Sequence, residues 1–179
     1  MMMYTTCYAS PLGNLLLASD GESLTGTWFE GQKYYGAGLA DGAVVQDGLP
    51  VFAAVMAWLD KYFDGKKPTI AGLPLVPEGS AFRQAVWSIL KTIPCGAFMT
   101  YGDIARTLAT ETGREVSAQA VGGAVGHNPI SVIIPCHRVV GSNGSLTGYA
   151  GGVDKKIKLL TLEGADMSAM FVPAKGTAL

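Results

Sequence analysis

A cysteine and a histidine stand side by side at the end of an apolar run. Residues 130–140 read Ile-Ser-Val-Ile-Ile-Pro-Cys-His-Arg-Val-Val, which predicts a strand stopped by Pro135. A histidine close to a cysteine can remove the thiol proton, and the thiolate is the nucleophile. Neighbours in a strand point to opposite faces, so Cys136 and His137 act together only where Pro135 breaks the strand or a water bridges them. For the bare dipeptide, a buried cysteine beside an unrelated histidine is the better interpretation.

The other chemistry-bearing patterns point away from metal, nucleotide and disulfide sites. Cys7, Cys95 and Cys136 are odd in number and far apart, so they form neither a disulfide framework nor a zinc pair. Residues 141–152 hold five glycines but lack the Gly-Lys-Ser/Thr of a phosphate-binding loop, and we interpret them as an active-site loop. No dinucleotide fingerprint is present, so no cofactor is expected, and the cysteine spacing likewise predicts no metal site. We expect Cys7 to lie in the core and Cys95 in a turn.

Composition predicts a folded protein without a membrane segment. Apolar residues make up 49% of the 179 residues and charged residues 15%, which excludes intrinsic disorder. The chain has no run of about 18 or more apolar residues, and its start lacks the basic and apolar regions of a secretory signal. We therefore expect a cytoplasmic protein in a reducing compartment.

Charge is distributed unevenly along the chain. Residues 1–79 carry four Lys or Arg against eight Asp or Glu, whereas residues 80–164 carry eight against five. An acidic half joined to a basic half indicates two domains, with the second facing a polyanion. Residues 64–79 contain Asp-Gly and three prolines, which is typical of a linker. We therefore predict an N-terminal domain over 1–79, a C-terminal domain over 80–164 and a tail over 165–179.

The N-terminal half has the pattern of a small β-meander followed by a helix. We predict three strands separated by turns, over residues 4–9, 15–17 and 24–29. Residues 36–48 are rich in Gly, Ala and Asp and are expected to form a loop. Apolar residues then recur at helical spacing from Phe52 to Phe63, and Gly65 is a stop signal.

The C-terminal half has a mainly helical pattern. Ser80 has the residue type of an N-cap, and Thr100 with Asp103 resembles a capping box that opens a further helix. After a polar turn another helix is expected near residues 116–125, and Pro129 ends it. Two short helices joined by a brief turn fit a helix-turn-helix, although a plain helical hairpin is slightly favoured on these residues alone.

The surroundings of the Cys-His pair form a longer pattern. It consists of Asn128-Pro129, Pro135-Cys136-His137-Arg138-Val139, Gly148-Tyr149-Ala150-Gly151-Gly152 and Glu163-Gly164, with weaker elements at Pro11–Gly13 and Tyr101–Ala105. Over roughly residues 4–164 the chain resembles the O6-alkylguanine-DNA alkyltransferase family, and its bacterial members look closest. The resemblance implies an α/β (α+β) fold, with a ribonuclease-H-like N-terminal domain and a winged helix-turn-helix-like C-terminal domain.

The resemblance also implies roles for individual residues. Cys136 matches the alkyl-accepting nucleophile, and His137 the base that activates it through water. Glu163, near the end of a helix that begins about residue 153, matches the carboxylate that orients this histidine. Asn128 matches the hinge asparagine beside the recognition helix, and Tyr101 the tyrosine near the phosphate of the flipped nucleotide.

The remaining candidate residues concern substrate and DNA. Tyr149, Ala150 and Gly151 match the loop that closes over the guanine. Ala118 and Gly122 belong to a helix whose small residues let its backbone approach DNA. For Arg138, an ion pair inside the domain is favoured over a phosphate contact.

One position on the expected recognition helix departs from the family. Many members carry an arginine there that fills the gap left by the flipped base, whereas this chain has Gln119. Glutamine can bond the orphaned base but brings no charge.

The predicted function is DNA repair by transfer of the alkyl group of O6-methylguanine, and possibly of O4-methylthymine, to Cys136 in an irreversible suicide reaction. The expected partner is double-stranded DNA containing O6-alkylguanine, bound by a monomer without a membrane. Two alternatives remain: a non-catalytic damage-binding or helix-turn-helix regulatory protein, and a cysteine hydrolase that uses Cys136, His137 and Glu163.

Overall fold

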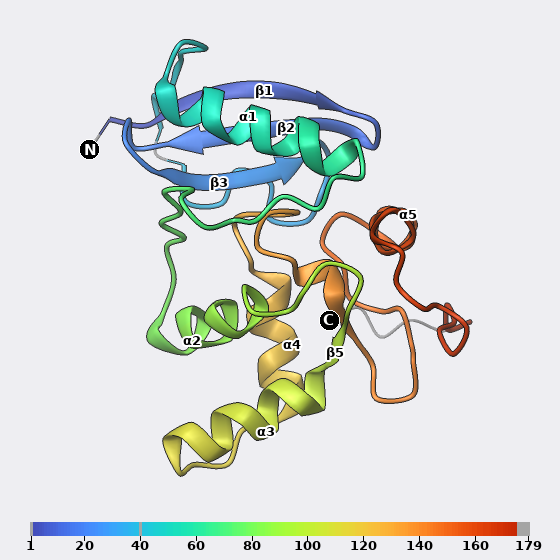
Figure 1. Ribbon diagram of the computed structural model, residues 1–179. Coiled ribbons are helices and arrows are strands. Elements are labelled where there is room, and N and C mark those ends of the chain that lie inside the picture. Colours follow the sequence, from blue (N-terminus) through green and yellow to red (C-terminus); the bar gives the residue numbers. More distant parts are fainter. Residues whose placement is uncertain (1, 40, 175–179) are drawn as a thin grey trace. The chain divides into compact units, whose positions relative to one another are not determined.

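The computed structural model describes residues 2–39 and 41–174, which form two compact units (Figure 1). Unit 1 contains the chain up to Glu78 together with Pro129–Ile133, and unit 2 contains Gly79–Asn128 and the chain from Ile134 onward. Unit 1 is built on a sheet and unit 2 mainly on helices. The mixed α/β class is therefore the predicted one.

Unit 1 holds a four-stranded sheet in the order β3-β2-β1-β4. Its members are β1 (Tyr4–Ser10), β2 (Gly13–Ser19), β3 (Leu24–Phe29) and β4 (Val44–Val45). The first three are consecutive and antiparallel, whereas β4 pairs in parallel with β1. The three predicted strands are confirmed, and β4 lies inside the segment that was predicted to be a loop.

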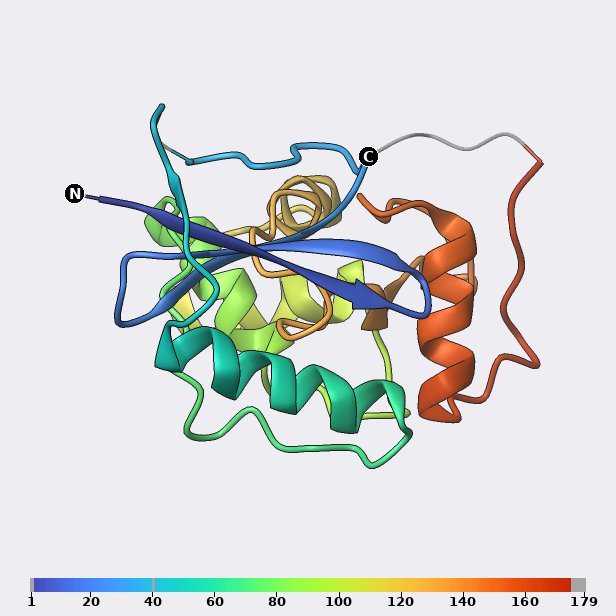
Figure 2. The ribbon, with the colours of Figure 1, turned by 90° about the horizontal axis from the view of Figure 1, so that it is seen from above.

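Helix α1 (Pro50–Phe63) covers one face of this sheet and runs along the strands (Figures 1 and 2). Its first turn contains Pro50, whose missing N–H would have no partner there in any case. The predicted helix between Phe52 and Phe63 is thus confirmed. The core beneath it is made of fully buried apolar side chains, among them Leu15, Leu17, Phe29, Phe52 and Leu59.

The expectation that Cys7 is a core residue is wrong, because its side chain is exposed. In the antiparallel register Cys7 lies opposite Leu16, which is only half-buried, while Leu15 and Leu17 on either side are fully buried. Paired residues share a face of the sheet, so Cys7 lies on the outer face. The sequence alternation did not reveal which face α1 would cover.

Residues 129–133 return to unit 1 instead of forming the predicted strand. Thr27 on β3 donates its backbone N–H to the Pro129 carbonyl (2.8 Å) and its hydroxyl to the Ser131 carbonyl (2.6 Å). Only Ile130 forms a bridge with Thr27, and the chain then turns through Val132, which has a φ of 71°. A short, fully buried apolar run does not distinguish a strand from packed turns.

Unit 2 is built from short elements. They are α2 (Ala81–Leu90), β5 (Met99–Thr100), α3 (Tyr101–Thr112), α4 (Ala118–Gly126), the 3₁₀ helix η1 (Cys136–Arg138), β6 (Val139–Val140) and α5 (Val153–Glu163). The predicted caps are confirmed: Ser80 accepts from the Arg83 N–H, and Thr100 and Asp103 form a complete capping box. Helices α3 and α4 are the predicted pair joined by a brief turn.

Packing in unit 2 fixes the frame around η1. Trp87 of α2 is buried and donates its indole N–H to the Ala124 carbonyl of α4 (2.9 Å). Strands β5 and β6 pair in parallel, with Met99 opposite Val139, so the segment that leads into β5 lies beside the end of η1, and α3 starts where β6 ends. In the described part of the chain, no helix combines the length and hydrophobicity that crossing a membrane requires.

Candidate active site

Cys136 is the first residue of η1, and its side chain is buried. Pro135 precedes the turn, and the Arg138 N–H donates to the Pro135 carbonyl (3.0 Å). A 3₁₀ helix has about three residues per turn, so successive side chains diverge by roughly 120° instead of lying on opposite faces. Strand geometry therefore does not separate Cys136 from His137.

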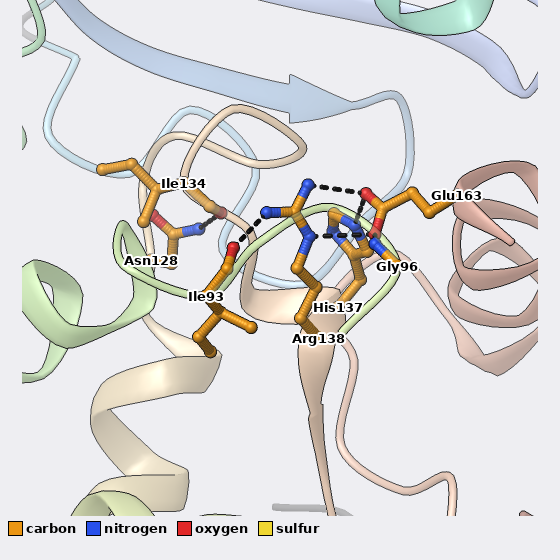
Figure 3. A network of polar contacts seen from close by, with 7 residues as sticks. All are labelled: Ile93, Gly96, Asn128, Ile134, His137, Arg138 and Glu163. Atoms are coloured by element: carbon orange, nitrogen blue, oxygen red, sulfur yellow. Dashed lines mark hydrogen bonds and ion pairs between the residues drawn. The ribbon is translucent and has the colours of Figure 1, made fainter. Parts of the chain in front are cut away.

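Glu163, at the end of α5, is the centre of a buried ionic network (Figure 3). Its Oε1 lies 2.6 Å from His137 Nε2 and accepts from Arg138 Nη2 (2.9 Å). Its Oε2 accepts from Arg138 Nε (2.9 Å) and from the Gly96 N–H (3.4 Å). Arg138 also donates to the Ile93 carbonyl (2.5 Å). The expectation that Arg138 forms an ion pair inside the domain is confirmed.

This network sets the protonation of His137. Burial alone would raise the pKa of Glu163, but the bonds and charges of His137 and Arg138 outweigh it and hold this pKa well below its usual range. Burial lowers the pKa of His137, although Glu163 acts in the opposite direction. An ionised carboxylate can only accept, so a neutral His137 carries its proton on Nε2 and its lone pair on Nδ1. His137 is therefore ready to accept a proton.

The Cys136 thiol is protonated at rest. Burial raises its pKa, while the Asn128 side chain, the Lys156 charge and the backbone N–H groups of residues 136 and 137 each lower it in part. These four groups favour the thiolate once the proton has been removed. The site therefore combines a base with preorganised stabilisation of the resulting anion.

Lys156 was missed by the sequence analysis. Its side chain is fully buried, and Nζ donates to the carbonyls of Val139 (2.5 Å) and Thr147 (2.9 Å). Burial lowers its pKa from 10.5 to about 8, although the nearby Cys136 thiolate acts in the opposite direction. A signal was present in the sequence, because Lys156 and Glu163 are seven residues apart and share a helical face with Leu159 and Leu160. Two charged residues on an apolar helical face indicate buried partners.

Asn128 lies where the chain leaves unit 2, and its Nδ2 donates to the carbonyl of Ile134, where the chain returns (2.8 Å; Figure 3). This bond joins the two residues that flank the segment 129–133. The same side chain is hydrogen-bonded to Cys136, and this bond lowers the pKa of the thiol. Asn128 thus joins the end of α4 to the segment that carries the nucleophile.

Two tyrosines lie close to the thiol: Tyr101 at the start of α3 and Tyr149 in the loop of residues 141–152. The Tyr101 hydroxyl donates to the Thr147 carbonyl (3.2 Å), and the Tyr149 ring meets the His137 ring edge-on at 6.4 Å between centroids. Burial, followed by the thiolate charge of Cys136, raises the pKa of both tyrosines. The buried Tyr149 hydroxyl has no hydrogen-bond partner among the described residues. Such a group is satisfied when a polar ligand enters.

The predicted DNA-facing helix is α4. Ala118 and Gln119 are exposed at its start, whereas Gly122 is buried. A groove between α3 and α4 is lined mainly by small side chains, together with Arg106 and Glu115. Helix α4 itself carries no charged side chain. In the described part of the chain, no three His, Cys, Asp or Glu side chains are grouped as metal ligands.

Comparison with family models identifies both halves of the chain. Residues 3–77 match the 6-O-methylguanine DNA methyltransferase ribonuclease-like domain, and residues 81–165 match the DNA-binding domain of the same proteins. A methylated-DNA–protein-cysteine methyltransferase of Haemophilus influenzae is 45% identical over 161 residues, covering 90% of this chain and 86% of the relative. One from Methanosarcina acetivorans is 42% identical over 164 residues, covering 91% and 99%.

Solved structures show the same similarity. The O6-methylguanine methyltransferase of Mycobacterium tuberculosis superposes with a TM-score of 0.78 at 38% identity, covering 97% of both chains. The structure of the M. tuberculosis protein in complex with DNA gives a TM-score of 0.77 at 38% identity, covering 97% of this chain and 96% of that one.

Proposed function

The chain belongs to the 6-O-methylguanine DNA methyltransferase family, and from this membership we infer that it repairs DNA by moving the alkyl group of O6-alkylguanine to Cys136. The observation that carries the proposal is the buried thiol beside His137, whose Nε2 is held 2.6 Å from the ionised Glu163. A buried carboxylate, imidazole and thiol in sequence provide a base and a nucleophile without a cofactor.

Thiol activation is the first step. His137 Nδ1 takes the Cys136 proton through a water molecule, and Glu163 stabilises the imidazolium that forms. The thiolate is stabilised by the Lys156 charge and the Asn128 side chain. Because burial otherwise raises the thiol pKa, the nucleophile forms only when the proton has a nearby acceptor.

Transfer is a single displacement. Cys136 Sγ forms a bond to the alkyl carbon while the bond from that carbon to guanine O6 breaks. The guanine keeps the electron pair and takes up one proton, so a thiol and an aryl ether become a thioether and guanine. A thioether has no acyl carbon for water to attack and does not exchange with thiols, so we propose one turnover per chain.

Access to guanine O6 requires the nucleotide to leave the duplex, which costs a few kcal/mol. The Tyr149 hydroxyl, which has no hydrogen-bond partner in the described part of the chain, supports a polar ligand beside Cys136, and Ala150 and Gly151 follow it in the loop. The exposed Gln119 on α4 is proposed to face the DNA, as is Ala118. Contact of Tyr101 with a phosphate, a monomeric state and a cytoplasmic location stay predictions.

Intact-mass spectrometry tests this proposal. Excess duplex containing one O6-methylguanine should add one CH₂ in mass to each chain, mapped to Cys136, and then stop. Cys136→Ala should show no mass change yet still bind the duplex, whereas Cys95→Ala should react like the parent.

Continued demethylation beyond one equivalent would contradict the suicide reaction and favour the cysteine hydrolase. Duplex binding without any mass change in the parent would favour the damage-binding alternative. Both outcomes are read from the same titration.

A further inference from the structure

The chain turns back after α5 and runs alongside the helix (Figure 2). Gly164 makes the turn with a φ of 74°, and the Ala165 N–H donates to the Leu160 carbonyl (3.0 Å). Met167 and Met170 then pack with Ala165 against a small core formed by Val140, Leu146 and Leu160. We call residues 165–171 the strap. The predicted tail therefore begins as a packed part of unit 2.

The strap is bonded to the active-site loop, residues 141–152. The Leu146 N–H donates to the Phe171 carbonyl (2.9 Å), and the Phe171 N–H donates to the Gly144 carbonyl (3.1 Å). This pairing is a parallel bridge between Ser145 and Phe171. The loop is thereby fixed to the strap at residues 144–146.

The sequence of the loop is specialised for this contact. Gly144 has a φ of 86°, and a Cβ added there would overlap the carbonyl oxygen of Ala169 in the strap. Only glycine allows the two backbones to approach this closely without strain. The contact therefore depends on residues of both segments: Gly144 in the loop allows the close approach, and the two methionines anchor the strap by packing.

Residues 144–146, which the strap holds, are followed within a few residues by side chains and carbonyls that contact the active site. Thr147 follows these residues directly, and its carbonyl accepts from both the Tyr101 hydroxyl and the Lys156 ammonium. Tyr149, whose ring meets that of His137, is three residues beyond Leu146, and three extended residues span at most about 10 Å. A displacement of the strap must therefore be transmitted to Tyr149 or absorbed by only three residues.

We propose that the strap is a specificity-determining element, which limits how far the loop can move away from Cys136 and thereby favours small alkyl groups over large ones. This inference rests on the proposed alkyl transfer. The strap holds the loop by two backbone bonds and by methionine packing, and Met side chains adapt readily to altered surroundings. Loosening the strap should thus let the loop move further from Cys136 while leaving the thiol and its base in place.

A matched pair of proline variants tests the strap. Phe171→Pro removes the N–H that donates to Gly144, whereas Val172→Pro alters the next residue, which is 55% exposed and whose N–H makes no backbone hydrogen bond among the residues that the structure describes. Hydrogen exchange at the Leu146 amide should accelerate about tenfold in Phe171→Pro and stay at the parent rate in Val172→Pro. Met170→Ala, which changes no backbone group, should give a smaller acceleration in the same direction.

Rates of transfer supply the second readout. For single-turnover reaction with duplexes that carry O6-methylguanine or O6-benzylguanine, the benzyl-to-methyl rate ratio should rise about fivefold in Phe171→Pro and not in Val172→Pro. A merely structural defect would lower both rates together and leave the ratio unchanged. An unchanged ratio, with or without faster exchange at Leu146, overturns the proposal.

The two readouts also separate this inference from the proposed function. If the parent transferred neither group, the alkyl-transfer proposal would fail, and the specificity proposal with it. The hydrogen-exchange data would still show whether the strap holds the loop at Leu146. If the parent transferred both and the variants kept its ratio, only the strap proposal would fail.

Discussion

The two units bury different kinds of polar side chain. In the described part of the chain, unit 1 buries only uncharged ones, namely Thr5, Thr6, Ser19, Thr27, Gln32 and Ser131. Unit 2 buries Asn128 together with the side chains of four acidic or basic residues, His137, Arg138, Lys156 and Glu163. All four are connected to Cys136 or its base. Charge is thus buried where the chemistry is proposed, and neutral polar groups serve the rest of the fold.

The difference has an energetic reason. Moving an ion out of water costs several kcal/mol even after relaxation, and a buried pair often stabilises a protein no better than apolar side chains of similar volume. A threonine that bonds a backbone carbonyl costs far less to bury. Stability alone therefore does not require the buried charges of unit 2. The proposed chemistry does require them, because they keep His137 neutral and stabilise the thiolate.

Among the substitutions that test this difference between the units, Glu163→Gln should cause the largest loss of stability and activity. The substitution leaves the Arg138 charge buried without its counterion, and removing one partner of a buried pair typically costs about 3–5 kcal/mol. Urea denaturation should show a loss of this size in the free energy of unfolding, and transfer should slow at least about tenfold because His137 loses its orienting carboxylate. Glu111→Gln, at an exposed position on α3, is the control. If Glu163→Gln lowered the free energy of unfolding by less than about 1 kcal/mol, breaking the ionic network of unit 2 would cost no more than breaking a neutral hydrogen bond of unit 1.

Lys156→Met should act mainly on the thiol. Without the nearby ammonium, which lowers the pKa of Cys136, this pKa should rise further, so the reaction of Cys136 with iodoacetamide at pH 7 should slow about tenfold. Lys158→Met, exposed on the same helix, should react like the parent. Equal rates for the two variants would remove Lys156 from thiolate stabilisation.

The same variant has a signature in the pH dependence of stability. The folded protein binds the Lys156 proton less tightly than the unfolded chain, because burial lowers this pKa from 10.5 to about 8. The contribution of Lys156 to the free energy of unfolding is therefore unfavourable below about pH 8 and becomes less so as the pH rises towards 10.5. The parent should show this gain in urea denaturation at increasing pH, and Lys156→Met should lack it.

Thr27→Val makes the matching change in unit 1. The hydroxyl that donates to the Ser131 carbonyl is lost, but that carbonyl still accepts from the Ile133 N–H, so we expect a cost of about 1 kcal/mol. Transfer rates should stay within about twofold of the parent. A cost as large as that of Glu163→Gln would show that the neutral contacts of unit 1 are as critical as the ionic network.

Gln119→Arg adds a charge to the uncharged helix α4 of unit 2 and should have the smallest effect. Helix α4 has no charged side chain, and Gln119 is exposed near its start. If this position faces DNA, one added cation should tighten duplex binding and steepen the dependence of log K on log salt concentration by about one unit. Identical slopes for the two proteins would place Gln119 away from the phosphates.

Local rules determined much of this protein. The three strands of unit 1 and the caps at Ser80 and Thr100 depend on residues next to each other in the sequence. The end of α5 at Gly164 does so as well, because glycine adopts the left-handed conformation without strain. The Cys-His pair and its flanking motifs likewise predicted the family. Each of these signals acts over a few residues, so the sequence displays it directly.

Tertiary structure decided the rest, because each of these features depends on residues distant in the chain. The fold buried Lys156 against the carbonyls of Val139 and Thr147, and it returned residues 129–133 to β3. The packing of α1 on one face of the sheet left Cys7 on the other. Burial is a property of what packs against a residue, and neither the hydrophobic period nor a capping motif specifies that partner.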